Sequence, residues 1–376
     1  ENPRVTLVNA EGRSFLGASR DRYDLVWYVA PDSYAAMNAA TSGAFVLSES
    51  YLYTREMVVE ALKHLTDDGL VVAQFGEISF EAKPNRTVRY LGTAREAFRQ
   101  LGIEDFARHV LVATAPGFGE VMSASVVMKK TPFTEADVRA FTERATRVEG
   151  AVVRFAWPRK NAEGPVSAAI TRAPELLRAW YQAYPFDVRP VTDDSPFFWH
   201  FVRFRDTIWP PRDAPAYNIE EGIGERLLLV LLGVATLFAA VFLLTPLLAI
   251  RRVWAEIPWK GSAGVYFAAL GLGFMFLEVS LIQRLTLFLG YPTYSLTVTL
   301  FALLVSTGLG SLLSERLANR RNAALRSLAV GLVLLVLVYQ RGLPLLAATG
   351  IGWPFSLRVV VAVVVLLPLG LCLGVF

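Results

Sequence analysis

The chain has 376 residues, of which 54% are hydrophobic and 19% charged, and its formal net charge is +4. Soluble domains average about 45–50% apolar and about 25% charged residues, so the composition argues against an entirely soluble chain. The arginine-rich stretches flank apolar runs, which indicates positions at a membrane edge and argues against a nucleic-acid partner. The single cysteine, Cys372, excludes an intrachain disulfide and a cysteine-based metal site.

Residues 1–147 alternate between strand-like and helix-like patterns. Apolar or alternating runs predict strands at 4–9, 23–30, 70–75, 107–115 and 121–128. Periodicity predicts helices at 48–65 and 85–101, and Thr134 with Asp137 forms a capping-box pattern for a third, ending near residue 147. A Pro-Gly-Phe-Gly turn separates the last two strands, as in a hairpin. This order predicts an α/β fold, a doubly wound sheet with one antiparallel strand.

Ligands of doubly wound sheets bind beyond the carboxyl ends of the strands. Those positions are predicted at residues 9–12, 31–33 and 74–77, and each segment carries a carboxylate or an amide. We therefore expect a small-molecule crevice there, without a metal. The sequence has no Gly-x-Ser-x-Gly elbow and no Cys/His pair, which argues against a nucleophilic hydrolase. Residues 148–222 are interpreted as an extension and linker, and the signals within 148–190 are mixed.

Residues 223–376 read as a membrane domain. A bilayer core of about 30 Å requires about 20 apolar residues in a helix. Apolar runs near this length predict about five spans, at residues 227–250, 263–282, 293–313, 327–339 and 359–376. The fourth run is short and is expected to extend by tilting or by using residues 342–353. The alternative, buried core helices of a large soluble protein, is disfavoured because such runs recur several times.

One carboxylate, Glu278, lies inside the second predicted span, and ionisable residues in a membrane are candidates for function. The alternative is an interfacial residue that pairs with Arg284, although six positions do not place two residues on one helix face. Glycines in the second and third spans suit close helix packing: Gly271, Gly273, Gly308 and Gly310.

The charges of the loops bear on orientation. Arginines cluster after the first and third spans, which favours a cytoplasmic location for those loops and an outward location for the soluble region. Large domains follow loop charge poorly, so the side of the soluble region stays open. The chain begins at Glu1 without a signal-peptide pattern and ends in an apolar run, so we interpret it as a fragment of a longer protein.

Several runs resemble the spermidine synthase family in order and spacing. Residues 5–16 (VTLVNAEGRSFL) resemble its segment of strand, acidic residue, Gly and Phe-Leu, and the tetrad Tyr-Asp-Leu-Val from Tyr23 follows at the family's distance. Residues 47–55 (LSESYLYTR) and 68–74 (DGLVVAQ) continue the match. Residues 191–201 (VTDDSPFFWHF) and 271–278 (GLGFMFLE) resemble the branch of the family that is fused to a membrane domain.

This resemblance implies a Rossmann-like fold of the S-adenosylmethionine-dependent methyltransferase type, present here in part over residues 1–147. It implies decarboxylated S-adenosylmethionine, or S-adenosylmethionine, as cofactor and a polyamine such as putrescine as substrate. By position, Glu11 matches the acidic residue that holds the adenine amino group, and we assign Gly12 and Gln74 to the same cofactor site. Asp32 matches the second acidic residue of the family's Asp-x-x-Asp turn, and Val29 falls where the first, catalytic Asp is expected.

Val29 bears on activity, because aminopropyl transfer requires an uncharged amine. Alkyl amines have a pKa of about 10, so a general base must remove a proton. Val29 has no group that could do this. Asp32 is the candidate catalytic residue, although an Asp after a proline is also an ordinary turn residue. The family's Gly-rich cofactor loop and its ribose-binding acidic residue lie outside this chain.

Two functions follow, both in an integral membrane protein, expected in a bacterial-type inner membrane with the lipid bilayer as a partner. The first is an aminopropyltransferase-like enzyme that uses an adenosyl cofactor and a polyamine. The alternative is a membrane transporter or sensor whose soluble region binds an adenosyl ligand without catalysis. Glu11, Asp32 and Gln74 favour the first function, whereas Val29 and the basic loops favour the second.

Overall fold

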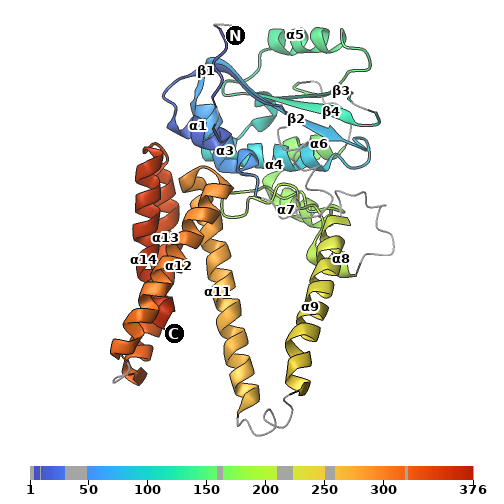
Figure 1. The fold of residues 1–376 in the computed structure, drawn as a ribbon. Coiled ribbons are helices and arrows are strands. Elements are labelled where there is room, and N and C mark those ends of the chain that lie inside the picture. The colour runs from blue at the N-terminus through green and yellow to red at the C-terminus, as the bar shows by residue number, and fades with distance from the viewer. Residues whose placement is uncertain are drawn as a thin grey trace. The chain divides into compact units, whose positions relative to one another are not determined.

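The computed structural model describes residues 4–8, 10–29, 49–117, 119–158, 164–209, 223–249, 259–317 and 321–375. The chain divides into two compact units. We call Arg20–Ile250 the sheet unit, and Glu1–Ser19 together with Arg251–Phe376 the helical unit. Figure 1 gives the elements of both units.

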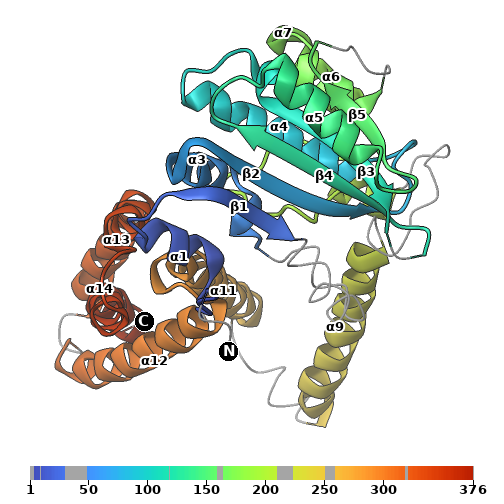
Figure 2. The same ribbon diagram turned by 90° about the horizontal axis from the view of Figure 1, so that it is seen from above.

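A mixed five-stranded sheet forms the centre of the sheet unit. Its strands are β1 (Tyr23–Val29), β2 (Leu65–Glu77), β3 (Val110–Pro116), β4 (Met122–Lys129) and β5 (Val152–Ala156). Their order is β1-β2-β4-β3-β5, and Figure 2 shows the first four side by side. Only β1 and β2 pair in parallel, and the other three pairings are antiparallel.

The hairpin of β3 and β4 explains this topology. It returns the chain so that β4 lies between β2 and β3 and runs opposite to both. Sequence patterning predicted this hairpin, and the structure confirms it. The prediction of one antiparallel strand is wrong, because β5 also runs opposite to its neighbour β3. β5 comes from the segment after residue 147, which the prediction left as an extension.

Helices cover both faces of the sheet. In Figure 1, α5 lies above it and α3, α4 and α6 lie below. These and the remaining helical segments are η2 (Tyr51–Tyr53), α3 (Arg55–Lys63), α4 (Asn85–Gln100), η3 (Phe106–His109), α5 (Glu135–Ala145), α6 (Pro165–Thr171), α7 (Pro174–Ala183), α8 (Phe204–Ile208) and α9 (Ile223–Ala249). The predicted capping box is confirmed, since Thr134 and Asp137 exchange side chain and backbone hydrogen bonds at the start of α5.

The helix predicted over residues 48–65 is two elements, η2 and α3. Thr54 separates them, because its extended backbone ends the first helix and its hydroxyl accepts a hydrogen bond from the Met57 amide of the second. A side-chain cap of this kind begins a helix by satisfying an amide that has no partner within the helix. The last predicted helical residues belong instead to β2, which begins at Leu65.

An aromatic core joins the segment 191–201 to α4 and the sheet. The Phe198 ring lies 4.5 Å from that of Tyr53 and 5.5 Å from that of Phe75, and Phe198 is fully buried. Arg89 of α4 donates to the carbonyls of Phe197 and Phe198 at 3.1 and 2.6 Å. Burial of such rings is a large hydrophobic contribution to stability. The buried aromatic residues of segment 191–201 therefore act as core residues.

The strand predicted at residues 4–9 is not formed where the structure describes it. Residues 4–8 are a turn and irregular chain, and a helix, α1 (Gly12–Ala18), follows. A run of alternating residues becomes a strand only when a neighbouring strand satisfies its backbone groups. Among the described residues, the strands pair only within the sheet β1 to β5.

Among the residues that the structure describes, five helices are long and apolar enough to cross a membrane, as the composition predicts. They are Gly224–Pro246 within α9, Lys260–Leu289, Pro292–Ser314, Ser327–Gly350 and Phe355–Val375. The last four lie in α11 (Lys260–Leu289), α12 (Pro292–Leu317), α13 (Arg321–Gly350) and α14 (Phe355–Val375) of the helical unit. The fourth span extends past its predicted end, because α13 continues through Pro344 to Gly350.

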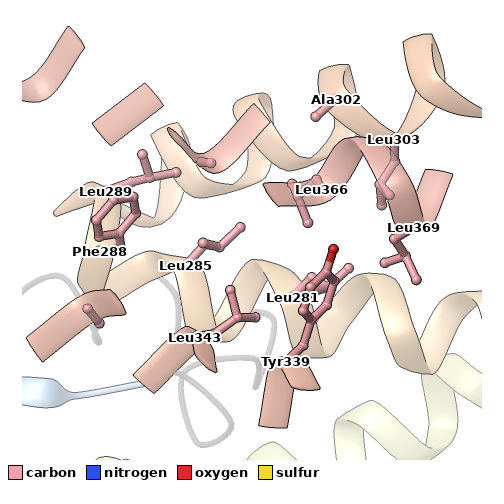
Figure 3. Close-up of a cluster of buried hydrophobic side chains, with 12 residues drawn as sticks. Leu281, Leu285, Phe288, Leu289, Ala302, Leu303, Tyr339, Leu343, Leu366 and Leu369 are labelled. Atoms are coloured by element: carbon pink, nitrogen blue, oxygen red, sulfur yellow. The ribbon is translucent and has the colours of Figure 1, made fainter. Parts of the chain in front are cut away.

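A buried cluster holds α11 to α14 together, and Figure 3 shows it. Leu285 and Phe288 of α11 meet Leu343 of α13 and Leu366 of α14 there, each 2% exposed or less. The hydroxyl of Tyr339 donates to the carbonyl of Val365, which links α13 to α14. Without a hydrophobic effect in lipid, such close packing and interhelical hydrogen bonds hold membrane helices together.

Candidate ligand site at the carboxyl ends of β1 and β2

The parallel strands β1 and β2 end at the same edge of the sheet, joined through α3. Val29 pairs with Gln74, and Gln74 pairs with Ser125 of β4. Residues directly opposite in a sheet present their side chains on the same face. Val29, Gln74 and Ser125 therefore form one row at the position where ligands bind in open α/β sheets.

Val29 is the last residue of β1 and is 57% exposed. Its isopropyl group therefore stands at the edge of the sheet, next to Gln74, instead of in the core. Leu25 and Trp27, on the same face of β1, are 48% and 53% exposed. This face of β1 is therefore open and apolar. At its carboxyl end, Val29 has no group that could accept a proton.

Gln74 is half-buried, and its side-chain amide donates to the Ser125 hydroxyl at 3.1 Å. This bond fixes the orientation of the amide across two strands. The carbonyl oxygen of the amide accepts no hydrogen bond from the residues that the structure describes. An amide oxygen accepts hydrogen bonds from hydroxyl or amine groups but does not take up a proton near neutral pH. Gln74 can therefore position a polar ligand without acting as a base.

Residues 74–77 were expected to be a loop, but β2 continues to Glu77. Phe75 faces the aromatic core, and Glu77 is 3% exposed. The Glu77 carboxylate accepts from the amide and the hydroxyl of Thr87, both at 2.8 Å. Glu77 therefore joins β2 to the start of α4 and has a structural role.

Glu11 and Gly12 belong to the helical unit, whereas Val29 and Gln74 belong to the sheet unit. Glu11 is the N-cap of α1, with its carboxylate oxygens 3.0 Å from the Arg13 amide and 2.7 Å from the Ser14 amide. Gly12 is the first residue of that helix. A carboxylate has about four lone-pair directions, so this cap leaves acceptor capacity. Binding of adenine by Glu11 stays a prediction.

Asp32, the predicted catalytic residue, lies outside the described residues, as does the rest of the turn at residues 31–33. Its role therefore stays a prediction from the sequence.

Glu278 is half-buried in α11 and forms no ion pair with the described residues. Arg284 donates from Nη1 to the Gln340 carbonyl of α13 at 3.2 Å. The alternative of a Glu278–Arg284 pair is therefore not formed, in keeping with their six-residue separation. Glu278 stays a candidate for function in the membrane.

Sequence patterning did not predict a second pair of ionisable groups, His200 and Glu225. The carboxylate of Glu225, at the start of α9, is 2% exposed, and His200 lies 3.8 Å away. Neither Glu225 oxygen has a hydrogen-bond partner among the described residues. Burial lowers the pKa of His200, and the positive charge of Arg89 lowers it further. The two residues are 25 positions apart in the chain, so local sequence patterns do not reveal their contact.

Within the described ranges, no group of three or more His, Cys, Asp or Glu side chains is placed to hold a metal ion. The chain was also compared with known proteins. No family model matches it, and no curated protein matches it.

Proposed function

We propose that this chain is an integral membrane protein whose soluble α/β region binds an adenosyl ligand without transferring a group from it, as in a sensor or a transporter. The observation that carries this proposal is Val29 at the carboxyl end of β1, exposed beside the Gln74 amide. The five helices that can span a bilayer support the membrane assignment. The adenosyl class of ligand rests on the family resemblance alone.

Binding and transfer require different groups at this edge of the sheet. Gln74 has a fixed amide whose oxygen can accept a hydrogen bond from a ligand hydroxyl or amine. Transfer to an amine additionally requires removal of a proton from a group with a pKa of about 10. Neither Val29 nor Gln74 supplies that base. The row of Val29, Gln74 and Ser125 therefore favours ligand binding over transfer of a group to an amine.

A second candidate function, aminopropyl transfer to a polyamine, is supported by Asp32. This residue matches the second acidic position of the family's catalytic turn, three residues after Val29. A carboxylate at that position could serve as the base if it reaches the amine. The two candidates therefore differ in one measurable step, the formation of methylthioadenosine.

The test uses the full-length protein in detergent with labelled decarboxylated S-adenosylmethionine, with and without putrescine. We expect saturable binding and no methylthioadenosine. Product that depends on putrescine and disappears in Asp32→Asn would establish the transferase instead. Absence of binding to decarboxylated S-adenosylmethionine and to S-adenosylmethionine would contradict both candidates. Gln74→Leu is the binding-site variant, and Gln100→Leu, an exposed residue at the end of α4, is its control.

A further inference from the structure

A separate pocket of about 720 Å³ lies in the sheet unit, between α4, α7 and the segment 189–205. None of its lining residues belongs to the row of Val29, Gln74 and Ser125. Six arginines line it against two glutamates, Glu96 and Glu104. The arginines are Arg95, Arg99, Arg178, Arg189, Arg203 and Arg205. Its volume is within the range of small-molecule sites, about 300–1,000 Å³.

Backbone carbonyls, which carry no net charge, hold two of these arginines in place. Arg203 donates to the carbonyls of Tyr181, Gln182 and Tyr184 at the end of α7, each at 3.2 Å. Arg95 donates to the carbonyl of Ala169 at 3.2 Å. These bonds orient the guanidinium groups but leave their positive charges without a counter-charge from those partners.

Two further arginines, Arg99 and Arg178, form neither a hydrogen bond nor an ion pair with the described residues. Of the six, Arg189 and Arg205 alone pair with carboxylates of the described ranges, those of Asp187 and Asp206. The pocket therefore has an excess of positive charge that its own anchoring contacts do not neutralise. An excess of this kind in a concave site raises the local concentration of anions.

Tyr181 adds a hydroxyl donor. Its side chain is 7% exposed, and the hydroxyl has no hydrogen-bond partner within the described residues. A methyl group added at Gly92 would overlap this hydroxyl, so the glycine makes room for it. Burial raises the pKa of Tyr181, so the hydroxyl keeps its proton. A buried donor without a partner is unfavourable, and an acceptor oxygen of a ligand would satisfy it.

Two lining residues of the pocket lie at α8, which packs against a membrane helix. Arg203 is the N-cap of α8 and Arg205 lies in it, and α8 packs against α9, whose membrane span begins at Gly224. Phe204 and Trp209, at the two ends of α8, are 59% and 75% exposed. Exposed aromatic residues next to a span are typical of the level of the lipid headgroups.

We propose that this arginine pocket binds the phosphate group of an anionic phospholipid headgroup. Guanidinium groups match phosphate oxygens with paired hydrogen bonds, and several arginines can share one phosphate. The Tyr181 hydroxyl donates a further bond. Basic pockets beside membrane helices suit such headgroups, because the surface and the lipid chain hold the phosphate nearby. The acyl chains would lie along the exposed apolar residues of α8.

The test measures the binding of short-chain phosphatidylglycerol to the full-length protein in neutral detergent, followed by thermal shift. Phosphatidylcholine of the same chain length and inorganic phosphate are the comparison probes. Arg99→Gln with Arg178→Gln removes two charges that have no structural partner among the described residues. Arg139→Gln with Arg144→Gln removes two equally exposed arginines from α5 as the matched control.

We expect phosphatidylglycerol to bind at least tenfold more tightly than phosphatidylcholine. The Arg99/Arg178 variant should lose about tenfold in affinity and the α5 control less than twofold. Tyr181→Phe should weaken binding further, with the fold retained as judged by its unliganded melting temperature. Equal binding of the two lipids, or an unchanged Arg99/Arg178 variant, would overturn the proposal. Inorganic phosphate that binds as tightly as the lipid would overturn the lipid assignment and indicate a soluble phosphate ligand.

Discussion

Nε2 of His200 lies 3.8 Å from Oε1 of Glu225, and this contact connects the segment 191–201 to the first turn of α9 within the sheet unit. Both groups are largely removed from solvent, with side chains 16% and 2% exposed. A buried carboxylate is unfavourable when ionised without hydrogen bonds, and a protonated imidazole is likewise unfavourable where water is largely excluded. The contact therefore places a group that can take up a proton, His200, next to the start of the first span.

We expect the stability of the sheet unit to fall as the pH falls below about 6.5, the ordinary pKa of histidine. Burial lowers the folded-state pKa of His200, and the positive charges of Arg89 and Arg189 lower it further. Asp187 has the opposite effect on this pKa. The Glu225 carboxylate also faces the imidazole. The unfolded chain therefore binds more protons in the window between the two pKa values, so unfolding becomes more favourable there. Stability is fully present above this window and is lost as the pH falls through it.

The measurement is the melting temperature of the detergent-solubilised chain between pH 7.5 and 5.5, for the wild type and His200→Gln. The wild type should lose more stability over this range than the variant, which cannot take up the proton. Parallel curves for the two proteins would contradict the buried, proton-sensitive role of His200.

Arg89 should be the most important polar residue for the stability of the sheet unit. Its guanidinium donates to the carbonyls of Asp187, Phe197 and Phe198 and lies over the Phe201 ring at 4.5 Å. Burial lowers its pKa to about 10, so it stays charged near neutral pH. We expect Arg89→Met to lower the free energy of unfolding by about 3–5 kcal/mol, because buried carbonyls lose their donor and Asp187 keeps only its pairing with Arg189.

Arg89→Lys should lose less stability than Arg89→Met, because lysine keeps the positive charge. It should still be less stable than the wild type, because lysine lacks the planar fork of donors. Arg99→Met, an exposed residue on the same helix, should change stability by no more than about 0.5 kcal/mol. Denaturant unfolding followed by tryptophan fluorescence would give these values. An Arg89→Met protein as stable as the Arg99 variant would refute the assignment.

The spans and the β3–β4 hairpin could be predicted because their signals are local. A run of about 20 apolar residues is visible without knowledge of the fold. The capping box of Thr134 and Asp137 likewise needs only a three-residue spacing. Glu11 shows the limit of such signals, because it caps α1 although glutamate is an uncommon N-cap residue.

The arginine pocket and the His200–Glu225 contact could not be predicted from patterns. The pocket joins α4 to residues about 75 to 113 positions later in the chain. In the sequence, the arginines of α4 and of α7 are each typical of the solvent-exposed face of a helix. Only tertiary packing brings the two sets together. The carboxyl ends of β1 and β2 were predictable as a neighbouring pair, but the extension of β2 to Glu77 depends on its pairing with β4.

Val29→Asp tests whether the missing base alone separates this chain from the transferases that it resembles. The residue is exposed at the edge of the sheet, so a carboxylate there should cost less than about 1 kcal/mol. If the soluble region binds decarboxylated S-adenosylmethionine, we expect the full-length variant to form methylthioadenosine with putrescine. Val29→Asn has the same size without the base and should form none. Equal product from the Asp and Asn variants would exclude a role for the introduced base.

The proposed adenosyl ligand also predicts the topology in the membrane. S-adenosylmethionine is made in the cytoplasm, so the sheet unit should face that side. If each span crosses once, the loop between α12 and α13 then lies outside, against the preference of its arginines. A reporter fused after Arg321 should therefore be extracytoplasmic. A cytoplasmic reporter would place the sheet unit outside and contradict a cytoplasmic ligand.

Two glycines of α12, two positions apart, should respond differently to the same substitution. A methyl group at Gly310 would overlap the Leu371 carbonyl of α14, whereas one at Gly308 would meet no described atom within 4 Å. Sequence patterning assigned both to close packing, together with Gly271 and Gly273, which also have open space around them. Only Gly310 of these four therefore lies where the helix backbones approach closely.

Gly310→Ala should destabilise the helical unit by about 1–3 kcal/mol, because a well-packed contact cannot accept a methyl group without a backbone shift. Gly308→Ala should leave it unchanged or slightly more stable, since alanine favours the helix and meets nothing. Unfolding of the two purified variants in mixed micelles with increasing dodecyl sulfate would compare them directly. Equal loss in both would show that helix propensity or lipid contact, and not the α12–α14 interface, determines the effect. A larger loss for Gly310→Ala, repeated at Gly374 of α14, whose added methyl group would overlap the Thr307 carbonyl, would locate the closest approach of the two helices.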